Sequence, residues 1–227
     1  MKPIITLRPV TAEDLPLMEG WLRAPQVTRW WGDNHAEELE GIRSGVAAGG
    51  ERGLYWIAAL DEWPYGFIQG YEISDEDGYL GELTSAGVEV PAGAWSIDYL
   101  IGEPEALGRG LASAMIHVAC DVLASQGVDG LLVPVNADNE SSWRALGRAG
   151  FQRLAGEYEM EPDAPGHSRR HVVYWRDLRE EVGGATSTNS GHGIGSTEAG
   201  LILLPTVEGH SITSAMVAEA LEDDLPE

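Results

Sequence analysis

Residues 98–112 read DYLIGEPEALGRGLA and carry the strongest structural signal in this chain of 227 residues. A strand is predicted over 95–101 and a long apolar helix over 111–125, with a Gly-x-Gly-x-Ala turn at 108–112 between them. Small residues let the backbone approach a ligand closely, and the first amides of a helix lack partners within the helix. Together with the helix dipole they predict an anion site that suits a diphosphate. A plain tight turn has the same pattern, so the motif by itself leaves both interpretations open.

The surroundings of this turn exclude other familiar sites. A dinucleotide-binding fold needs an acidic residue at the end of the next strand, where this chain has Val135 and Asn136. A P-loop needs the motif Gly-Lys-Ser/Thr, and many serine hydrolases need the Gly-x-Ser-x-Gly motif around their nucleophile. Neither motif is present in the sequence. The six histidines lack metal-ligand spacing, so we expect no metal.

Apolar periodicity predicts further elements on both sides of the turn. We expect strands at 4–8, 55–60, 65–71, 130–135, 151–158 and 171–175, a hairpin turn at 61–64, and helices at 13–22, 36–48 and 139–148. With the two elements above, about seven strands and four helices in mixed order predict a three-layer α/β (α+β) domain over residues 1–179.

The composition changes after Arg179. Residues 180–200 are rich in Gly, Ser and Thr and are expected to form a linker. Residues 201–227 are expected to form an acidic extension, with a strand at 201–204 and a helix at 211–221. Because exposed Leu201–Leu204 would be adhesive, we expect the extension to pack on its own core or on a second subunit of a homodimer.

The chain is strongly acidic, with 14 Lys and Arg against 37 Asp and Glu and a formal net charge of −23. Such a field repels nucleic acid and anionic membranes and attracts cations, so a cationic small molecule is the expected partner. Solubility or salt adaptation explains the same charge equally well. One cysteine, Cys120, no long apolar run and no apolar leader predict a cytoplasmic protein without a signal peptide.

Several motifs together resemble the GCN5-related N-acetyltransferases (GNATs). They are the glycine turn at 108–112, VPVNADN at 133–139 and RAGF at 148–151. The chain further resembles the aminoglycoside 6'-N-acetyltransferases through WWG at 30–32, PYGFIQGY at 64–71, SID at 96–98 and GEP at 102–104. This resemblance covers about residues 4–178. It implies the GNAT fold and transfer of an acetyl group from acetyl-CoA to an amine, an activity of the antibiotic-resistance type.

The resemblance also implies where acetyl-CoA binds. The cofactor would lie on the glycine turn, with Asn139 against its arm and a main-chain N–H near Leu100 binding the thioester oxygen. Asn139 also suits a helix N-cap, and it could serve both purposes. The residues expected at the cofactor are Leu100, Ile101, Leu107, Gly108, Arg109, Gly110, Leu111, Ala112 and Asn139.

Asp98 is the expected catalytic residue beside Leu100, because it precedes this site on the same strand. It would orient the substrate ammonium and accept its proton, although an ordinary carboxyl with a pKa of about 4 is a weak base for an amine. Adjacent indoles diverge, so one of Trp30 and Trp31 is expected to line a cleft and stack on a sugar or an ammonium group. The residues expected at the substrate are Trp30, Trp31, Asp33, Tyr71, Glu82, Asp98 and Asp138.

Two positions depart from the family pattern. Leu146 stands where many members carry a tyrosine that protonates the leaving thiolate, so water is the expected proton donor. Pro134 stands where the aminoglycoside enzymes often have an Asp that contacts drug amines. These departures leave two alternatives open, which are acetylation of another small amine, such as a siderophore precursor or a polyamine, and a non-catalytic CoA-binding domain.

Overall fold

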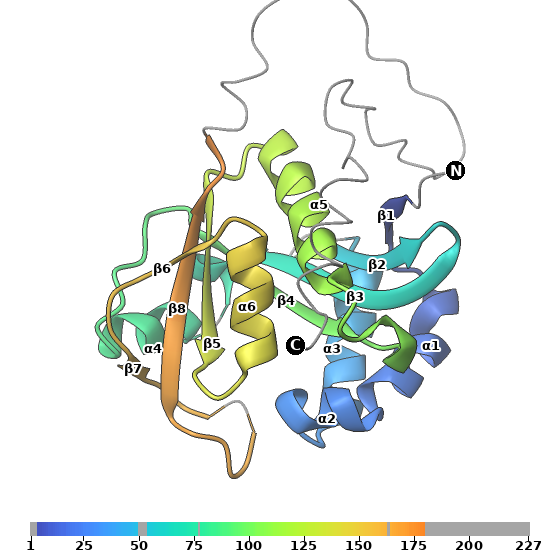
Figure 1. Ribbon diagram of the computed structural model, residues 1–227, viewed down its shortest axis with the longest axis horizontal. Helices are drawn as coiled ribbons and strands as arrows, with labels where there is room; N and C mark the ends of the chain where they lie inside the picture. Colours follow the sequence, from blue (N-terminus) through green and yellow to red (C-terminus); the bar gives the residue numbers. More distant parts are fainter. Residues whose placement is uncertain (1–3, 50–53, 77, 163, 180–227) are drawn as a thin grey trace, which may run out of the picture.

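The computed structural model describes residues 4–49, 54–76, 78–162 and 164–179 (Figure 1). One mixed sheet has the strand order β1-β2-β3-β4-β5-β8-β6, with β7 paired to β8. The strands are β1 (Ile5–Pro9), β2 (Leu54–Leu60), β3 (Trp63–Glu72), β4 (Trp95–Ile101), β5 (Gly130–Asn136), β6 (Gln152–Arg153), β7 (Tyr158–Glu159) and β8 (Arg170–Asp177). The α-helices are α1 (Leu15–Leu22), α2 (Pro25–Trp31), α3 (His35–Ala47), α4 (Tyr79–Ser85), α5 (Leu111–Ser125) and α6 (Glu140–Arg148).

Helices cover both faces of the sheet and make three layers. On one face α5 and α6 lie in front of the strands in Figure 1, where Met115 packs in a core that includes Ile68. On the other face α1, α2 and α3 pack around Phe67, and α4 packs with β5 and β8 around Leu83 and Val173. This arrangement confirms the predicted three-layer fold.

The parallel neighbours β4 and β5 diverge. β3 and β4 pair along their whole length, from Glu72 with Trp95 to Gly66 with Ile101. In contrast, β4 and β5 pair at a single position within the described ranges, Trp95 with Leu131. The edge of β4 beyond Trp95 is therefore not paired with β5, and this edge borders the cavity described below.

Most of the predicted elements are present, and β4 and α5 have the predicted bounds. Two short helices, α2 and α4, were not predicted, because seven residues give too little periodicity to detect. The predicted strand at 151–158 is wrong: β6 and β7 each pair with β8 over two residues, and Gly156 between them has a φ of 97°. The hairpin turn is also shorter than predicted, because Trp63 and Pro64 already pair with β2.

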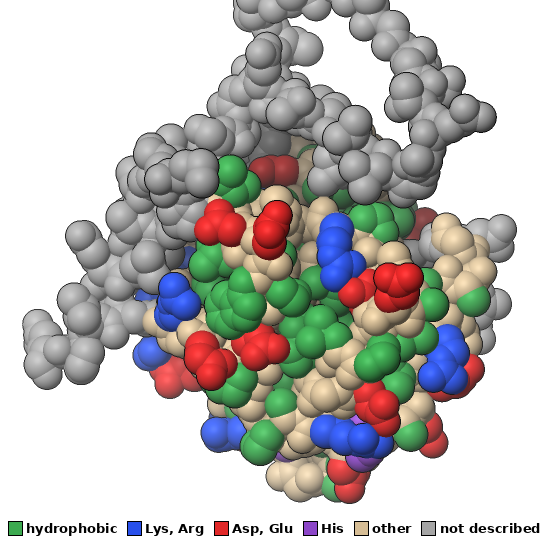
Figure 2. All heavy atoms as spheres, turned by 90° about the vertical axis from the view of Figure 1, so that its right-hand side faces the viewer, with side chains coloured by type: hydrophobic (Ala, Val, Ile, Leu, Met, Phe, Trp, Pro, Cys, Tyr) green, Lys and Arg blue, Asp and Glu red, His purple; other side chains and the backbone are tan. Residues whose placement is uncertain are grey.

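The predicted linker at 180–200 and the acidic extension at 201–227 lie outside the described residues. Within the described ranges, no helix combines the length and apolar character that a bilayer crossing requires. The same ranges hold no group of three or more His, Cys, Asp or Glu placed to bind a metal ion. On the face drawn in Figure 2, acidic side chains are dispersed among apolar and basic ones rather than gathered into one patch.

Candidate active site

The glycine turn leads directly into α5. Gly108 and Gly110 both have a φ of 67°, a conformation that favours glycine, and Gly110 is the N-cap of the helix. No acidic side chain occupies the first turn of α5, and the Tyr65 hydroxyl on β3 donates to the Leu111 carbonyl at 3.2 Å, which anchors this turn to the sheet. The amides of the turn are thus held at the positive end of the helix dipole, as an anion site requires.

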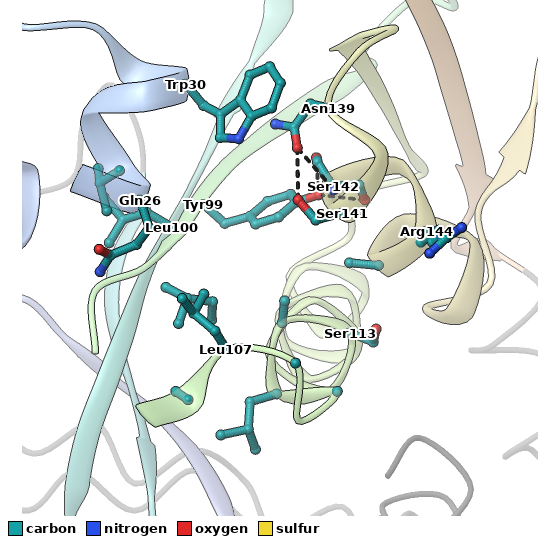
Figure 3. A pocket seen from close by; sticks show the side chains of 18 of the residues that line it. Gln26, Trp30, Tyr99, Leu100, Leu107, Ser113, Asn139, Ser141, Ser142 and Arg144 are labelled. Carbon is teal, nitrogen blue, oxygen red and sulfur yellow. Dashed lines mark hydrogen bonds between the residues drawn. The ribbon is translucent and has the colours of Figure 1, made fainter. Parts of the chain in front are cut away.

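A cavity of about 440 Å³ adjoins this turn, and its lining residues come from α2, β4, α5 and α6 (Figure 3). Among the described residues, its charged lining residues are Arg29, Arg144 and Arg148, of which Arg144 is paired with Glu140, and no Asp or Glu lines the cavity itself. In a chain with 14 Lys and Arg against 37 Asp and Glu, this selection of arginines makes the basic cavity suitable for an anion.

The structure brings eight of the nine predicted cofactor residues to the basic cavity. Arg109 is not among the lining residues; it is exposed, and its guanidinium donates to the Glu105 carbonyl at 3.4 Å. Asn139 caps α6, since its side-chain oxygen accepts the Ser142 amide at 3.2 Å and the Ser141 hydroxyl at 3.0 Å. Figure 3 shows the Asn139 amide nitrogen on the side of Trp30, where it can still meet a ligand.

Trp30 and Trp31 both line the basic cavity at the end of α2 but point in different directions. Trp31 packs in the core, with its ring centroid 6.4 Å from that of Phe67. The Trp30 ring lies 5.2 Å from the ring of His167, whose Nε2 is 2.6 Å from the Arg29 carbonyl oxygen. The loop that precedes β8 therefore reaches across to α2 beside the cavity.

Successive amides of β4 point alternately to β3 and to the opposite, unpaired edge of the strand. The Gly102 amide donates to the Tyr65 carbonyl at 2.9 Å, and the Ile73 amide donates to the Ala94 carbonyl at 3.1 Å. Since alternate residues of an antiparallel strand bond to the same neighbour, Leu100 also bonds to β3. The N–H groups of Tyr99 and Ile101 face the other edge, where pairing with β5 has ended. The prediction named Leu100 for the main-chain N–H that binds the thioester oxygen, but the structure turns the amides of its neighbours to this edge. The sequence does not reveal which alternate residues of a strand bond to which neighbour.

A second cavity, of about 530 Å³, lies on the Asp98 face of β3 and β4. Three carboxylates line it, from Glu76, Glu82 and Asp98, and no Lys or Arg is among the described residues that line it. The other lining residues are Tyr55, Gln69, Gly70, Tyr71, Gly78 and Tyr79. Carboxylates and tyrosine rings are the groups that bind ammonium ions, so this acidic cavity suits a cation.

The Asp98 carboxylate is held by its neighbours. Gln69, its partner across the strands, donates from Nε2 to Oδ2 at 2.9 Å. The rings of Tyr71 and Tyr79 lie beside it, with centroids 6.2 Å apart. Burial, and then the negative charge of Asp98, raise the pKa of Tyr71 and of Tyr79, so both phenols keep their protons.

The two cavities meet on β4. Asp98 lines the acidic cavity, whereas the next two residues, Tyr99 and Leu100, line the basic one. Adjacent residues of β4 therefore line the two cavities, and their side chains point to opposite faces of the sheet.

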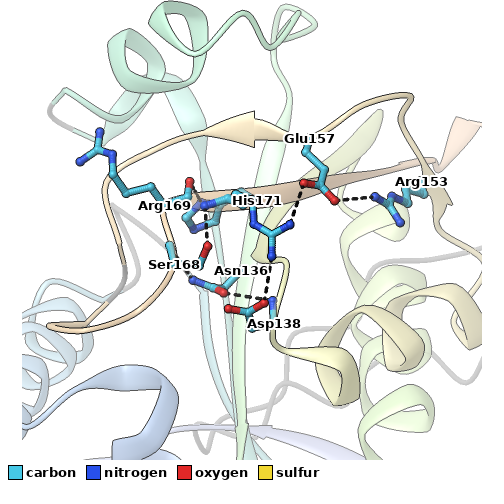
Figure 4. A network of polar contacts seen from close by, with 8 residues as sticks. Asn136, Asp138, Arg153, Glu157, Ser168, Arg169 and His171 are labelled. Carbon is cyan, nitrogen blue, oxygen red and sulfur yellow. Dashed lines mark hydrogen bonds and ion pairs between the residues drawn. The ribbon is translucent and has the colours of Figure 1, made fainter.

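Two predicted substrate residues lie outside both cavities. Asp33 is exposed after α2 and lines neither cavity. Asp138 is exposed as well; its carboxylate is 3.4 Å from the guanidinium of Arg170, which also contacts Glu157, and its amide donates to Asn136 at 3.1 Å (Figure 4). The Asp138 carboxylate is therefore engaged by the ion pair with Arg170. Three other residues predicted at the substrate line the acidic cavity together, namely Tyr71, Glu82 and Asp98.

Sequence reasoning missed several lining residues. They are Gln26, Tyr99, Ser141, Ser142, Arg144 and Arg148 in the basic cavity and Tyr55, Gln69, Glu76 and Tyr79 in the acidic one. Strand alternation places Gln69 and Tyr71 on one face of β3, so Gln69 could have been found from Tyr71. The arginines on α6 carry no such signal, because many exposed helices have arginines.

Comparisons with known proteins identify similar chains. Residues 10–159 match the family model described as an acetyltransferase (GNAT) domain. The chain is 28% identical over 168 residues to the aminoglycoside N(6')-acetyltransferases type 1 of Klebsiella pneumoniae and Serratia marcescens, which covers 71% of this chain and 79% of each relative.

Solved structures are similar as well. The aminoglycoside acetyltransferase AAC(6')-Ib in complex with coenzyme A has a TM-score of 0.65 at 26% identity, covering 81% of this chain and 100% of the other. AAC(6')-Ib with parmomycin and acetyl-CoA has a TM-score of 0.65 at 25% identity, covering 82% and 99%. Since the family model spans more than half of the sequence, the chain belongs to the GNAT-domain acetyltransferases.

Proposed function

We propose that this protein transfers the acetyl group of acetyl-CoA to an amine of a polycationic small molecule, foremost the 6'-amine of an aminoglycoside. The transfer occurs by direct attack of the amine while both substrates are bound. The curated relatives are aminoglycoside N(6')-acetyltransferases, and related structures contain coenzyme A or acetyl-CoA.

The observation that carries this proposal is the opposite charge of two cavities that meet on β4. The basic cavity presents Arg29, Arg144 and Arg148 beside the glycine turn. The charged groups that line the acidic cavity, within the part of the chain that the structure describes, are the carboxylates of Glu76, Glu82 and Asp98. An anionic cosubstrate and a cationic acceptor are thereby sorted to opposite sides of one strand.

Each group then has a chemical role. The turn at 108–112 binds the diphosphate of acetyl-CoA through its amides. The outward amides of Tyr99 and Ile101 stabilise the negative charge that develops on the thioester oxygen. Asp98 binds the acceptor ammonium and receives the proton that the amine must lose before it attacks, directly or through water. Holding the two reactants in contact supplies much of the rate enhancement.

The test is acetyl-CoA turnover with a panel of amines. The panel contains kanamycin- and tobramycin-class aminoglycosides, linear polyamines and hydroxylamine siderophore precursors. Release of free thiol measures the rate, and mass spectrometry with fragmentation locates the acetyl group. We expect the highest kcat/KM with aminoglycosides and modification at the 6'-amine.

Other outcomes contradict the proposal at distinct levels. Turnover restricted to linear polyamines or siderophore precursors would overturn the choice of acceptor and retain the acetyltransferase chemistry. Binding of acetyl-CoA by calorimetry without turnover of any amine would identify a CoA-binding domain without catalysis.

A further inference from the structure

The Tyr99 side chain crosses the basic cavity from β4 to the first turn of α6 (Figure 3). Its hydroxyl oxygen lies 2.7 Å from the Ser142 hydroxyl and 3.2 Å from the Ser142 carbonyl oxygen. Removal of the phenol from solvent raises the pKa of Tyr99, so the hydroxyl carries a proton throughout the physiological pH range.

The main chain of the same residue marks where the thioester reacts. The amides of Tyr99 and Ile101 face the unpaired edge of β4, and Asp98 faces the acidic cavity from the preceding position. Under the proposed function, the thioester carbonyl lies at this edge, and its sulfur lies in the basic cavity into which the Tyr99 ring projects.

Two other polar side chains of the cavity are engaged elsewhere. The Ser141 hydroxyl donates to Asn139 at 3.0 Å. The guanidinium of Arg144 is paired with Glu140 and exposed. Tyr99 is the hydroxyl-bearing residue that β4 itself contributes to the lining of this cavity.

We propose that the Tyr99 hydroxyl donates a hydrogen bond to the coenzyme A sulfur as the thioester carbon–sulfur bond breaks. This inference rests on the proposed function. When Tyr99 turns its proton to the sulfur, the Ser142 hydroxyl can donate in turn to the Tyr99 oxygen across the 2.7 Å contact. The two aligned donors then stabilise the negative charge that develops on the sulfur.

The atoms balance without any proton transfer from tyrosine. The amine nitrogen forms the new C–N bond, the C–S bond breaks, and its electron pair moves to sulfur. The surplus proton of the amine leaves through Asp98 or water, and the sulfur takes a proton from water. Tyr99 keeps its own proton, as its raised pKa requires.

The experiment compares the full-length protein with Tyr99→Phe and Ser142→Ala. The thiol of bound coenzyme A is titrated through the ultraviolet absorbance of its thiolate, with desulfo-coenzyme A as the blank that removes protein signals. A lost hydrogen bond to the thiolate should raise the pKa of the bound thiol by about one unit in Tyr99→Phe. The kcat should fall about tenfold, whereas the Kd of desulfo-coenzyme A should stay within about twofold, since that ligand has no sulfur. Ser142→Ala should also raise the pKa of the bound thiol and lower kcat, but by less than Tyr99→Phe.

Tyr158→Phe is the control, because it removes a hydroxyl that donates to the Ala155 carbonyl at a similar distance, 3.2 Å, and Tyr158 lines neither cavity. It should leave the titration of the bound thiol unchanged. An unchanged thiol pKa in Tyr99→Phe, with or without a lower kcat, would overturn the inference and assign Tyr99 a packing role. Failure of the wild-type protein to bind coenzyme A would instead overturn the proposed function.

Discussion

Asp98 lies where the two cavities meet, and its carboxylate is oriented by Gln69. Asp98→Asn keeps the shape of the side chain and an oxygen that Gln69 can contact, but removes the charge that, as we propose, binds and deprotonates the amine. We expect kcat/KM for the amine to fall about 100-fold. Steady-state thiol release measures this, and calorimetry should give an unchanged Kd for coenzyme A. Wild-type turnover by the Asn variant would remove Asp98 from the mechanism.

A substitution at Gly108 tests the proposed anion site separately from the amine site. Its φ is 67°, and an added Cβ would meet no atom within 4 Å, so Gly108→Ala imposes backbone strain without a steric clash. We expect a stability loss of about 1 kcal/mol from the left-handed conformation. The affinity for coenzyme A should fall about tenfold, because a methyl group would block close approach of the diphosphate.

Gly49 supplies the control for this substitution. It has a φ of 68° and equally open surroundings, and it follows α3 rather than bordering the basic cavity. Gly49→Ala should lower the melting temperature as much as Gly108→Ala and leave the Kd for coenzyme A unchanged. Equal losses of affinity in the two variants would indicate a general effect of strain rather than a diphosphate site.

At the scale of single elements, the entry into α1 depends on one carboxylate. The Asp14 carboxylate accepts two hydrogen bonds from the guanidinium of Arg8, at 2.6 and 2.7 Å. It also accepts hydrogen bonds from the amide and the hydroxyl of Thr11, both at 2.9 Å. Burial opposes ionisation of Asp14, but these hydrogen bonds outweigh it, and the pKa of Asp14 is lowered.

This lowered pKa predicts how stability depends on pH. Because the pKa of Asp14 is lower in the folded than in the unfolded chain, its contribution is complete above the unfolded value of about 3.9 and disappears as the pH falls through the folded value. Asp14→Asn should destabilise the protein by about 2 kcal/mol at pH 7 and by less at pH 3, as denaturant unfolding would measure. Glu19→Gln, which removes an exposed pair with Arg23, should cost under about 0.5 kcal/mol. An Asp14→Asn effect that is the same at both pH values would contradict this assignment.

The divergence of β4 from β5 leaves one edge of β4 without a neighbouring strand. Strand pairing ends after Trp95 and Leu131, and the cavity at this edge is lined by α5 and α6. A continuously paired sheet would occupy the outward amides of Tyr99 and Ile101, so the loss of ladder hydrogen bonds here leaves donors for a ligand.

For the whole molecule, the formal charge of −23 acts differently on the two substrates. The field attracts a polycationic amine and repels acetyl-CoA, for which we propose the local arginines of the basic cavity as binding groups. Salt screens the long-range field over a Debye length of about 10 Å at 0.1 M. We therefore expect the KM for the amine to rise severalfold as salt increases, while the KM for acetyl-CoA stays constant or falls. A parallel rise of both constants would contradict this role of the net charge.

The amino-acid sequence alone determined β4, the glycine turn and α5, because strand alternation, permissive glycines and a long apolar helix are local properties. It also pointed to Asp98 in the acidic cavity, to eight of the nine residues predicted at the cofactor that line the basic cavity, and to the GNAT family. Only the tertiary structure decided which acids share a cavity. Glu76, Glu82 and Asp98 meet through the packing of α4 beside β3 and β4, while Asp138 pairs with Arg170 on another strand. Such convergence depends on strand register and on the placement of short helices, which local periodicity does not encode.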